Sequence, residues 1–210
     1  SGKWKSREPV LQQWALEYTS SLEQGGRFTH IIWPYHCLIG STGHAVSPAL
    51  MPALEEWSEK RGRAAFVGFV TAGYPSLDET VDVMIGMERG GTDIIELGVP
   101  FTDPLADGAT IQKTNEVALA GGAPVSLTDC LARTKAARAK GLTAPVILMG
   151  YYNPFLAFGL DALMKSSVES GVNGFIVVDL PPEEGMAFVE AANKRGLSYV
   201  PLVTPTSTDE

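Results

Sequence analysis

From residue 65 onward, the sequence alternates between short runs rich in β-forming residues and longer segments with helical signals. The short runs are residues 66–72, 93–99, 145–150, 174–179 and 199–204. Each is almost continuously apolar, which is typical of parallel strands that are covered on both faces. Repeated strand–helix units predict an α/β fold, either an open doubly wound sheet or a closed barrel.

The segments between these runs carry the signals of helix ends. The expected helices begin near Ser76, Ala109, Ser126, Leu160 and Pro181. A glycine closes four of them, as is common at helix C-termini. No G-x-G-x-x-G motif follows the first strand, which disfavours a dinucleotide-binding sheet. A closed eight-stranded barrel takes about 250 residues. We therefore predict an incomplete TIM (β/α)8 barrel with about five of its eight strand–helix units, preceded by a short α/β fragment.

The first 60 residues differ in composition from the rest of the chain. All four tryptophans and all three histidines lie before residue 60. Residues 1–60 hold five basic and six acidic side chains, a net charge of −1, whereas residues 61–210 hold 11 basic and 18 acidic ones, a net charge of −7. We therefore expect two segments of different origin, 1–60 and 61–210.

The overall charge and composition exclude several classes of function. The net charge is −8 and no run of Lys or Arg is present, which argues against nucleic-acid binding. No apolar run approaches 18 residues, so we expect no membrane span. Cys37 and Cys130 are the only cysteines and predict no disulfide framework, so we expect a cytoplasmic location.

The expected strand 93–99 has an ionisable residue, Glu96, at its centre. A charge in an otherwise apolar strand is costly unless it is paired or used. If Glu96 points into the mouth of a barrel, desolvation raises its pKa and makes it a proton carrier near neutral pH. The alternative is a structural pair with a lysine or arginine. Two further carboxylates follow on the next loop: Asp107 is either functional or a helix N-cap, and Asp103 before Pro104 favours a turn.

Other candidate residues follow the later strands. No histidine occurs after residue 60, so acid–base chemistry in this part must come from carboxylates, tyrosines or lysines. Tyr151 and Tyr152 follow the third strand and either line a pocket for a flat apolar ligand or pack within the loop. Asp179 ends the fourth strand and is either functional or a structural residue that fixes the turn or caps the helix that follows.

Four segments carry a specific resemblance: 69–75 (FVTAGYP), 96–108 (ELGVPFTDPLADG), 149–154 (MGYYNP) and 178–184 (VDLPPEE). Together they closely resemble the tryptophan synthase α subunit, most of all the α part of fused α–β enzymes of fungi. The resemblance runs from about Gly62 to Glu210. It implies a TIM barrel that cleaves indole-3-glycerol phosphate to indole and glyceraldehyde 3-phosphate in tryptophan biosynthesis, with no metal and no cofactor of its own.

The resemblance also implies roles for individual residues. Glu96 would carry the proton in the retro-aldol step, and Asp107 would accept a hydrogen bond from the indole N–H and stabilise positive charge there. Asp103 would support the loop and the contact with a β subunit, which uses pyridoxal phosphate. The implied pocket-lining residues are Phe69, Thr71, Leu148, Tyr151, Ile176, Val178 and Leu202.

The family's phosphate-binding loops would follow residue 210, so we expect this chain to be inactive by itself. The alternative is a non-catalytic remnant that docks a β-type partner. Residues 31–44 (IIWPYHCLIGSTGH) resemble a fragment of the nicotinamidase/isochorismatase-like cysteine hydrolases. This second resemblance makes His36 a former metal ligand and does not make Cys37 the nucleophile. One histidine cannot hold a metal, so we predict no metal site, and a metal-dependent hydrolase fragment is the third alternative.

Overall fold

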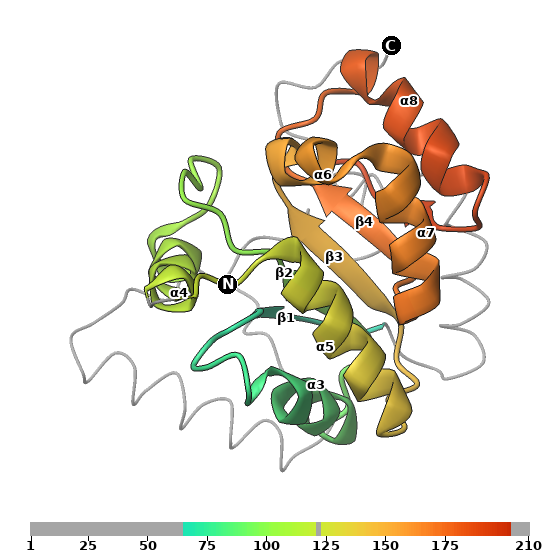
Figure 1. The fold of residues 1–210 in the computed structure, drawn as a ribbon. Coiled ribbons are helices and arrows are strands. Elements are labelled where there is room, and N and C mark those ends of the chain that lie inside the picture. Colours follow the sequence, from blue (N-terminus) through green and yellow to red (C-terminus); the bar gives the residue numbers. More distant parts are fainter. Residues whose placement is uncertain (1–64, 121–122, 203–210) are drawn as a thin grey trace, which may run out of the picture. The chain divides into compact units, whose positions relative to one another are not determined.

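The computed structural model describes residues 65–120 and 123–202, and within them five parallel strands form one sheet in the order β1-β2-β3-β4-β5 (Figure 1). The strands are β1 (Val67–Thr71), β2 (Ile94–Gly98), β3 (Val146–Gly150), β4 (Gly174–Val177) and β5 (Ser198–Tyr199). All five expected strands are found, each shorter than the apolar run that predicted it. The predicted boundary near residue 60 and the α/β fragment before it lie outside the described residues.

Helices connect successive strands. They are α3 (Thr80–Arg89), α4 (Ala109–Leu119), α5 (Leu127–Ala139), α6 (Tyr152–Phe158), α7 (Leu160–Ser170) and α8 (Pro182–Asn193). Helices α3, α5, α7 and α8 contact one another in that order and form a row along the sheet, whereas α4 lies apart from the row beside β1 (Figure 1). Among the described residues, no helix is both long and apolar enough to cross a bilayer.

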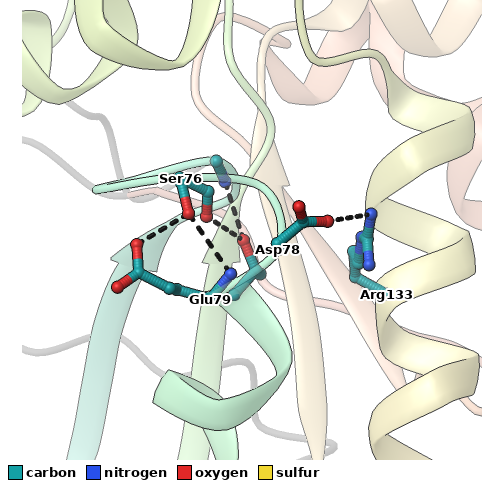
Figure 2. A network of polar contacts seen from close by, with 6 residues as sticks. Ser76, Asp78, Glu79 and Arg133 are labelled. Atoms are coloured by element: carbon teal, nitrogen blue, oxygen red, sulfur yellow. Dashed lines mark hydrogen bonds and ion pairs between the residues drawn. The ribbon is translucent and has the colours of Figure 1, made fainter.

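The helix starts show how local sequence sets these boundaries. Ser126 and Asp129 form a capping box at the start of α5, each side chain accepting from the backbone N–H of the other. By contrast, α3 begins at Thr80 rather than near Ser76, because the Ser76 hydroxyl bonds to Glu79 within a preceding turn (Figure 2). An ion pair between Asp78 and Arg133 connects that turn to α5.

This ion pair is exposed, and its two atoms lie 3.2 Å apart (Figure 2).

Helix α6 was not expected, since Asn153-Pro154 is typical of a loop. Proline is tolerated there because it falls in the first turn of the helix, where its missing N–H would have no intrahelical partner.

The two faces of the sheet differ in what covers them. Ile95 and Leu97 of β2, Leu148 of β3 and Phe175 of β4 are fully buried in the core on the helix-covered face. Successive side chains of a strand point to opposite faces. Glu96 therefore lies on the other face, in register with Phe69 of β1 and Ile147 of β3.

An arginine fastens the loops at the N-terminal ends of β3 and β4. The Arg138 guanidinium donates to the backbone carbonyls of Leu142, Ala144 and Gly171 at 2.8–3.0 Å, and to Oδ1 of Asn173 at 2.8 Å. Because these acceptors belong to two separate connections, the one between α5 and β3 and the one between α7 and β4, one side chain joins the ends of several elements.

A carboxylate also holds the loop between α5 and β3. Oε1 of Glu88 accepts from the backbone N–H and the hydroxyl of Thr143 and from the N–H of Ala144, at 2.6–2.9 Å. These hydrogen bonds, led by the one from the Thr143 hydroxyl, lower the pKa of the Glu88 carboxyl. Helix α3, which carries Glu88, is thereby connected to the start of β3.

Candidate active site

A small pocket lies at the C-terminal edge of the sheet, lined by residues of β1 to β3, of α4 and of the loops that follow the strands. It brings together five of the residues singled out from the sequence: Phe69, Thr71, Asp107, Tyr151 and Val178. Its enclosed volume is about 10 Å³, enough for about one water molecule. The carboxyl ends of parallel strands are where α/β folds place their ligands, so the position of the pocket agrees with a functional site.

Glu96 lies on the pocket-facing side of β2, two residues before the pocket-lining Gly98, but it is not itself a lining residue. Burial raises the pKa of the Glu96 carboxyl, and desolvation is the one cause that acts on it among the described residues. No lysine or arginine of the described part pairs with it. The structural pair considered as the alternative is therefore absent from the part of the chain that the structure describes. A raised pKa keeps the carboxyl protonated to higher pH than usual.

The Phe69 ring of the pocket packs against Gly98. A Cβ atom added at Gly98 would lie 2.7 Å from Cζ of Phe69, closer than unbonded carbon atoms approach. The ring therefore packs directly over the glycine backbone, beside the strand position of Glu96. Only a residue without a side chain allows this placement of the aromatic ring.

Asp107 lies immediately before α4, whose N-cap is Gly108, so the N-cap interpretation of Asp107 is wrong. Burial raises the pKa of the Asp107 carboxyl, and a hydrogen bond with the Tyr151 hydroxyl opposes that rise. The same hydroxyl accepts from the backbone N–H of Ala106 at 2.8 Å. The Tyr151 ring stacks on Phe101, with centroids 4.9 Å apart. Tyr151 thus contacts the loop that carries Asp107 at three points.

Helix α4 is held over the pocket by two side-chain bonds. The hydroxyls of Thr71 and Thr114 lie 2.6 Å apart, and Thr114 donates its proton to the carbonyl of Ile111, so Thr71 is the donor to Thr114. Oδ1 of Asn115 accepts from the N–H of Phe101 at 3.1 Å. These bonds join α4 to β1 and to the segment after β2.

The comparisons with known proteins agree with this architecture. The sequence model of the tryptophan synthase alpha chain family matches residues 56–210. The chain belongs to the tryptophan synthase alpha chain family. The family resemblance predicted from the sequence motifs is thereby confirmed, as is the partial barrel, since solved alpha chains superpose on the described sheet and helices.

Among its relatives, the tryptophan synthase of Saccharomyces cerevisiae is 50% identical over 153 residues, which make up 73% of this chain and 21% of that protein. The tryptophan synthase alpha chain of Roseiflexus castenholzii is 46% identical over 71% of this chain and 56% of its own length. The crystal structure of the alpha subunit from Legionella pneumophila matches with a TM-score of 0.71 at 36% identity, over 76% of this chain and 60% of that one. The chain thus spans about half the length of the curated alpha chains it matches.

Within this tryptophan synthase alpha-type fold, three of the implied pocket residues do not line the pocket. Leu148 is fully buried on the helix-covered face, and the pocket is lined instead by the next residue, Met149. A shift of one position along a strand moves a side chain to the opposite face. Leu202 lies beyond the two-residue β5 and is 52% exposed. Ile176 is buried in register with Met149, but it does not line the pocket itself.

The remaining carboxylates have structural contacts. Asp103 accepts from the Thr102 hydroxyl at 2.6 Å in an exposed turn, which agrees with the turn interpretation. Asp179 does not cap α8, the helix after it, so that expectation is wrong. Its Oδ1 accepts instead from the N–H of Tyr152, the first residue of α6, at 2.7 Å. Among the described residues, no group of three or more His, Cys, Asp or Glu side chains is placed to hold a metal ion. His36 and Cys37 lie outside the described residues.

Sequence reasoning missed six pocket-lining residues: Gly98, Val99, Ile111, Asn115, Met149 and Gly150. Met149 could have been found by counting back two positions from Tyr151 along a period-two strand. Ile111 and Asn115 are four residues apart on α4 and so share one helix face. Which face of α4 meets the pocket could not be read from the sequence, because it depends on the Thr71–Thr114 contact between distant segments.

Proposed function

We propose that this chain carries the α-type lyase site of tryptophan synthase, which cleaves indole-3-glycerol phosphate to indole and glyceraldehyde 3-phosphate. The observation that supports this most directly is Glu96, a carboxyl with a burial-raised pKa beside the Phe69 ring on the pocket-facing side of β2. A carboxyl with a raised pKa next to an aromatic wall suits the transfer of a proton to an indole ring.

In the proposed reaction, Glu96 donates its proton to the indole carbon that bears the glycerol side chain. As the bond to that side chain breaks, the electron pair stays with the indole ring, and the Glu96 carboxylate takes the proton of the neighbouring hydroxyl, which becomes the aldehyde. The carboxyl is then back in its starting form. Asp107 accepts a hydrogen bond from the indole N–H, where positive charge develops. The Tyr151 hydroxyl favours the ionised form of Asp107 that this role requires.

The reaction proposed for this site uses no metal and no cofactor of this chain. Pyridoxal phosphate would belong to a β subunit or a fused β domain, which we propose as the protein partner, and we expect the protein to work in the cytoplasm. We also propose that these 210 residues turn over little substrate by themselves. A ligand pocket for a small organic molecule has a volume of about 300 Å³ or more, whereas the pocket here encloses about 10 Å³.

The test measures indole release from indole-3-glycerol phosphate by this 210-residue chain and by the same sequence extended to the full length of an alpha chain. We expect activity in the extended protein and a loss of about 100-fold or more in Glu96→Gln. Glu116→Gln is the matched control, since Glu116 is exposed on α4 and pairs with Lys113. Full activity of Glu96→Gln would refute the lyase site, and turnover by the 210 residues at the rate of the extended protein would refute the proposed inactivity.

A second candidate function is docking of a β-type partner without catalysis. The observation that favours it is Leu105 in the loop after β2, which is 90% exposed. Co-purification with a tryptophan synthase β subunit separates the two functions. Binding that needs Leu105, combined with no indole release from the extended protein, would favour the docking function alone.

A further inference from the structure

Helix α6 begins without a capping side chain of its own, because Tyr151 occupies its N-cap position. The N–H of Tyr152 donates instead to Oδ1 of Asp179 at 2.7 Å. Asp179 follows β4 and Tyr152 follows β3, so this bond joins the ends of two neighbouring strands. A carboxylate at the first turn of a helix stabilises that turn both as a hydrogen-bond acceptor and as a negative charge near the helix dipole.

Tyr151, the residue before Tyr152, contacts the loop that carries Asp107. The Tyr151 hydroxyl accepts from the N–H of Ala106 at 2.8 Å, and its ring stacks on Phe101. Tyr151 is almost completely buried. A buried tyrosine has only two side-chain torsions, each confined to a few values. The position of its hydroxyl therefore follows the position of its backbone.

We propose that Asp179 is a positioning residue that holds Asp107 in place through Tyr151. The bond to Tyr152 fixes the backbone between β3 and α6, and this fixes the backbone position from which the Tyr151 side chain extends. The ring then holds the loop through Ala106 and Phe101. This proposal rests on the proposed lyase function, because placement of Asp107 matters to the reaction only if Asp107 acts on the substrate.

Asp179 itself is exposed and does not line the pocket, although Val178 before it does. Asp179 therefore acts through other residues and not on a bound molecule. The competing explanation is that Asp179 is a local cap, whose removal loosens only the first turn of α6. The two explanations differ in what happens at the N–H of Ala106, which belongs to a loop after a different strand.

Amide hydrogen exchange of the 210-residue chain, followed by NMR, separates these explanations. In Asp179→Ala, we expect exchange at Tyr152 to rise by about fivefold, the usual effect of losing a helix cap. We expect exchange at Ala106 to rise by about threefold as well, measured relative to amides of β3. Asp179→Asn keeps an acceptor oxygen, so both rates should stay within about twofold of wild type.

Two further variants make the test specific. Asp129→Ala removes the cap of α5, and it should raise exchange at Ser126, whose N–H bonds to Asp129, while leaving Ala106 unchanged relative to β3. Tyr151→Phe should raise exchange at Ala106 by itself, and adding Asp179→Ala to it should cause no further rise there.

An Ala106 rate that is unchanged in Asp179→Ala would make Asp179 a local cap and overturn the proposal. An Ala106 rate that is unchanged in Tyr151→Phe would overturn it as well, whether or not Asp179→Ala folds. None of these rates depends on turnover. A failure of this proposal is therefore distinct from a failure of the lyase function, which the indole assay tests.

Discussion

Replacing Arg138 with methionine removes the guanidinium that holds the loops before β3 and β4, while it keeps an unbranched side chain along the aliphatic part of the arginine. Three backbone carbonyls lose a charged donor, and two of them belong to the buried residues Leu142 and Ala144. A hydrogen bond to a charged group contributes about 1.5–3 kcal/mol. Gly171 is only half-buried, so water can replace its donor. Counting the two buried carbonyls at the lower value gives a loss of about 3 kcal/mol.

The measurement is the free energy of unfolding of the full chain in urea, followed by circular dichroism. The matched control is Arg133→Met on the same helix, because Arg133 pairs with an almost fully exposed Asp78 and its loss should cost less than about 0.5 kcal/mol. Arg138→Lys keeps the charge but not the planar array of donors, so we expect a loss of about 2 kcal/mol. Equal stabilities of Arg138→Met and Arg133→Met would show that the bonds to Arg138 do not hold the loops together.

Three other outcomes are expected from the same unfolding measurement. The Ser167 hydroxyl is buried on α7 and, among the described residues, has no hydrogen-bond partner; Ser167→Ala should therefore raise stability by about 1 kcal/mol more than Ser166→Ala on the same helix, and an equal effect of the two would contradict this. Gly98→Ala places a Cβ atom against the Phe69 ring and should cost about 2 kcal/mol, with partial recovery when Phe69→Leu is added; no recovery would point to a different cause. The pKa of Glu88 is lower in the folded chain, so the contribution of Glu88 to stability is present above the ordinary glutamate pKa of about 4.3 and is lost as pH falls through the folded value. The stability difference between wild type and Glu88→Gln should therefore shrink on acidification. A difference that grows would contradict this.

The strands could be predicted because burial on both sides of a parallel sheet leaves an unbroken apolar run in the sequence. Helix ends were predicted where the signal is local, as in the capping box of Ser126 and Asp129. Helix α6 was missed because Asn153 and Pro154 carry the same signal in a turn and in the first turn of a helix. The bond that starts this helix comes from Asp179 on another strand, and local sequence does not contain it.

The candidate site shows the same limit. Glu96 stood out because a charge in an apolar strand is costly, and the structure places it on the pocket-facing side of β2. Leu148 and Met149 are adjacent apolar residues in one strand, so their types do not show which of them points to the pocket face of the sheet. Which face each residue takes follows from the hydrogen-bonded register with β2 and β4, which is a long-range property. Likewise, the three contacts of Tyr151 join segments about 45 residues apart.

The bonds of Arg138 and Glu88 lie at the opposite rim of the sheet from the pocket. These bonds hold the sheet at a distance from the pocket and involve neither Met149 nor Val178. A laboratory search for altered substrate preference can therefore randomise positions such as Met149 and Val178 with little loss of folding. The same diversity introduced around Arg138 would yield mostly misfolded protein.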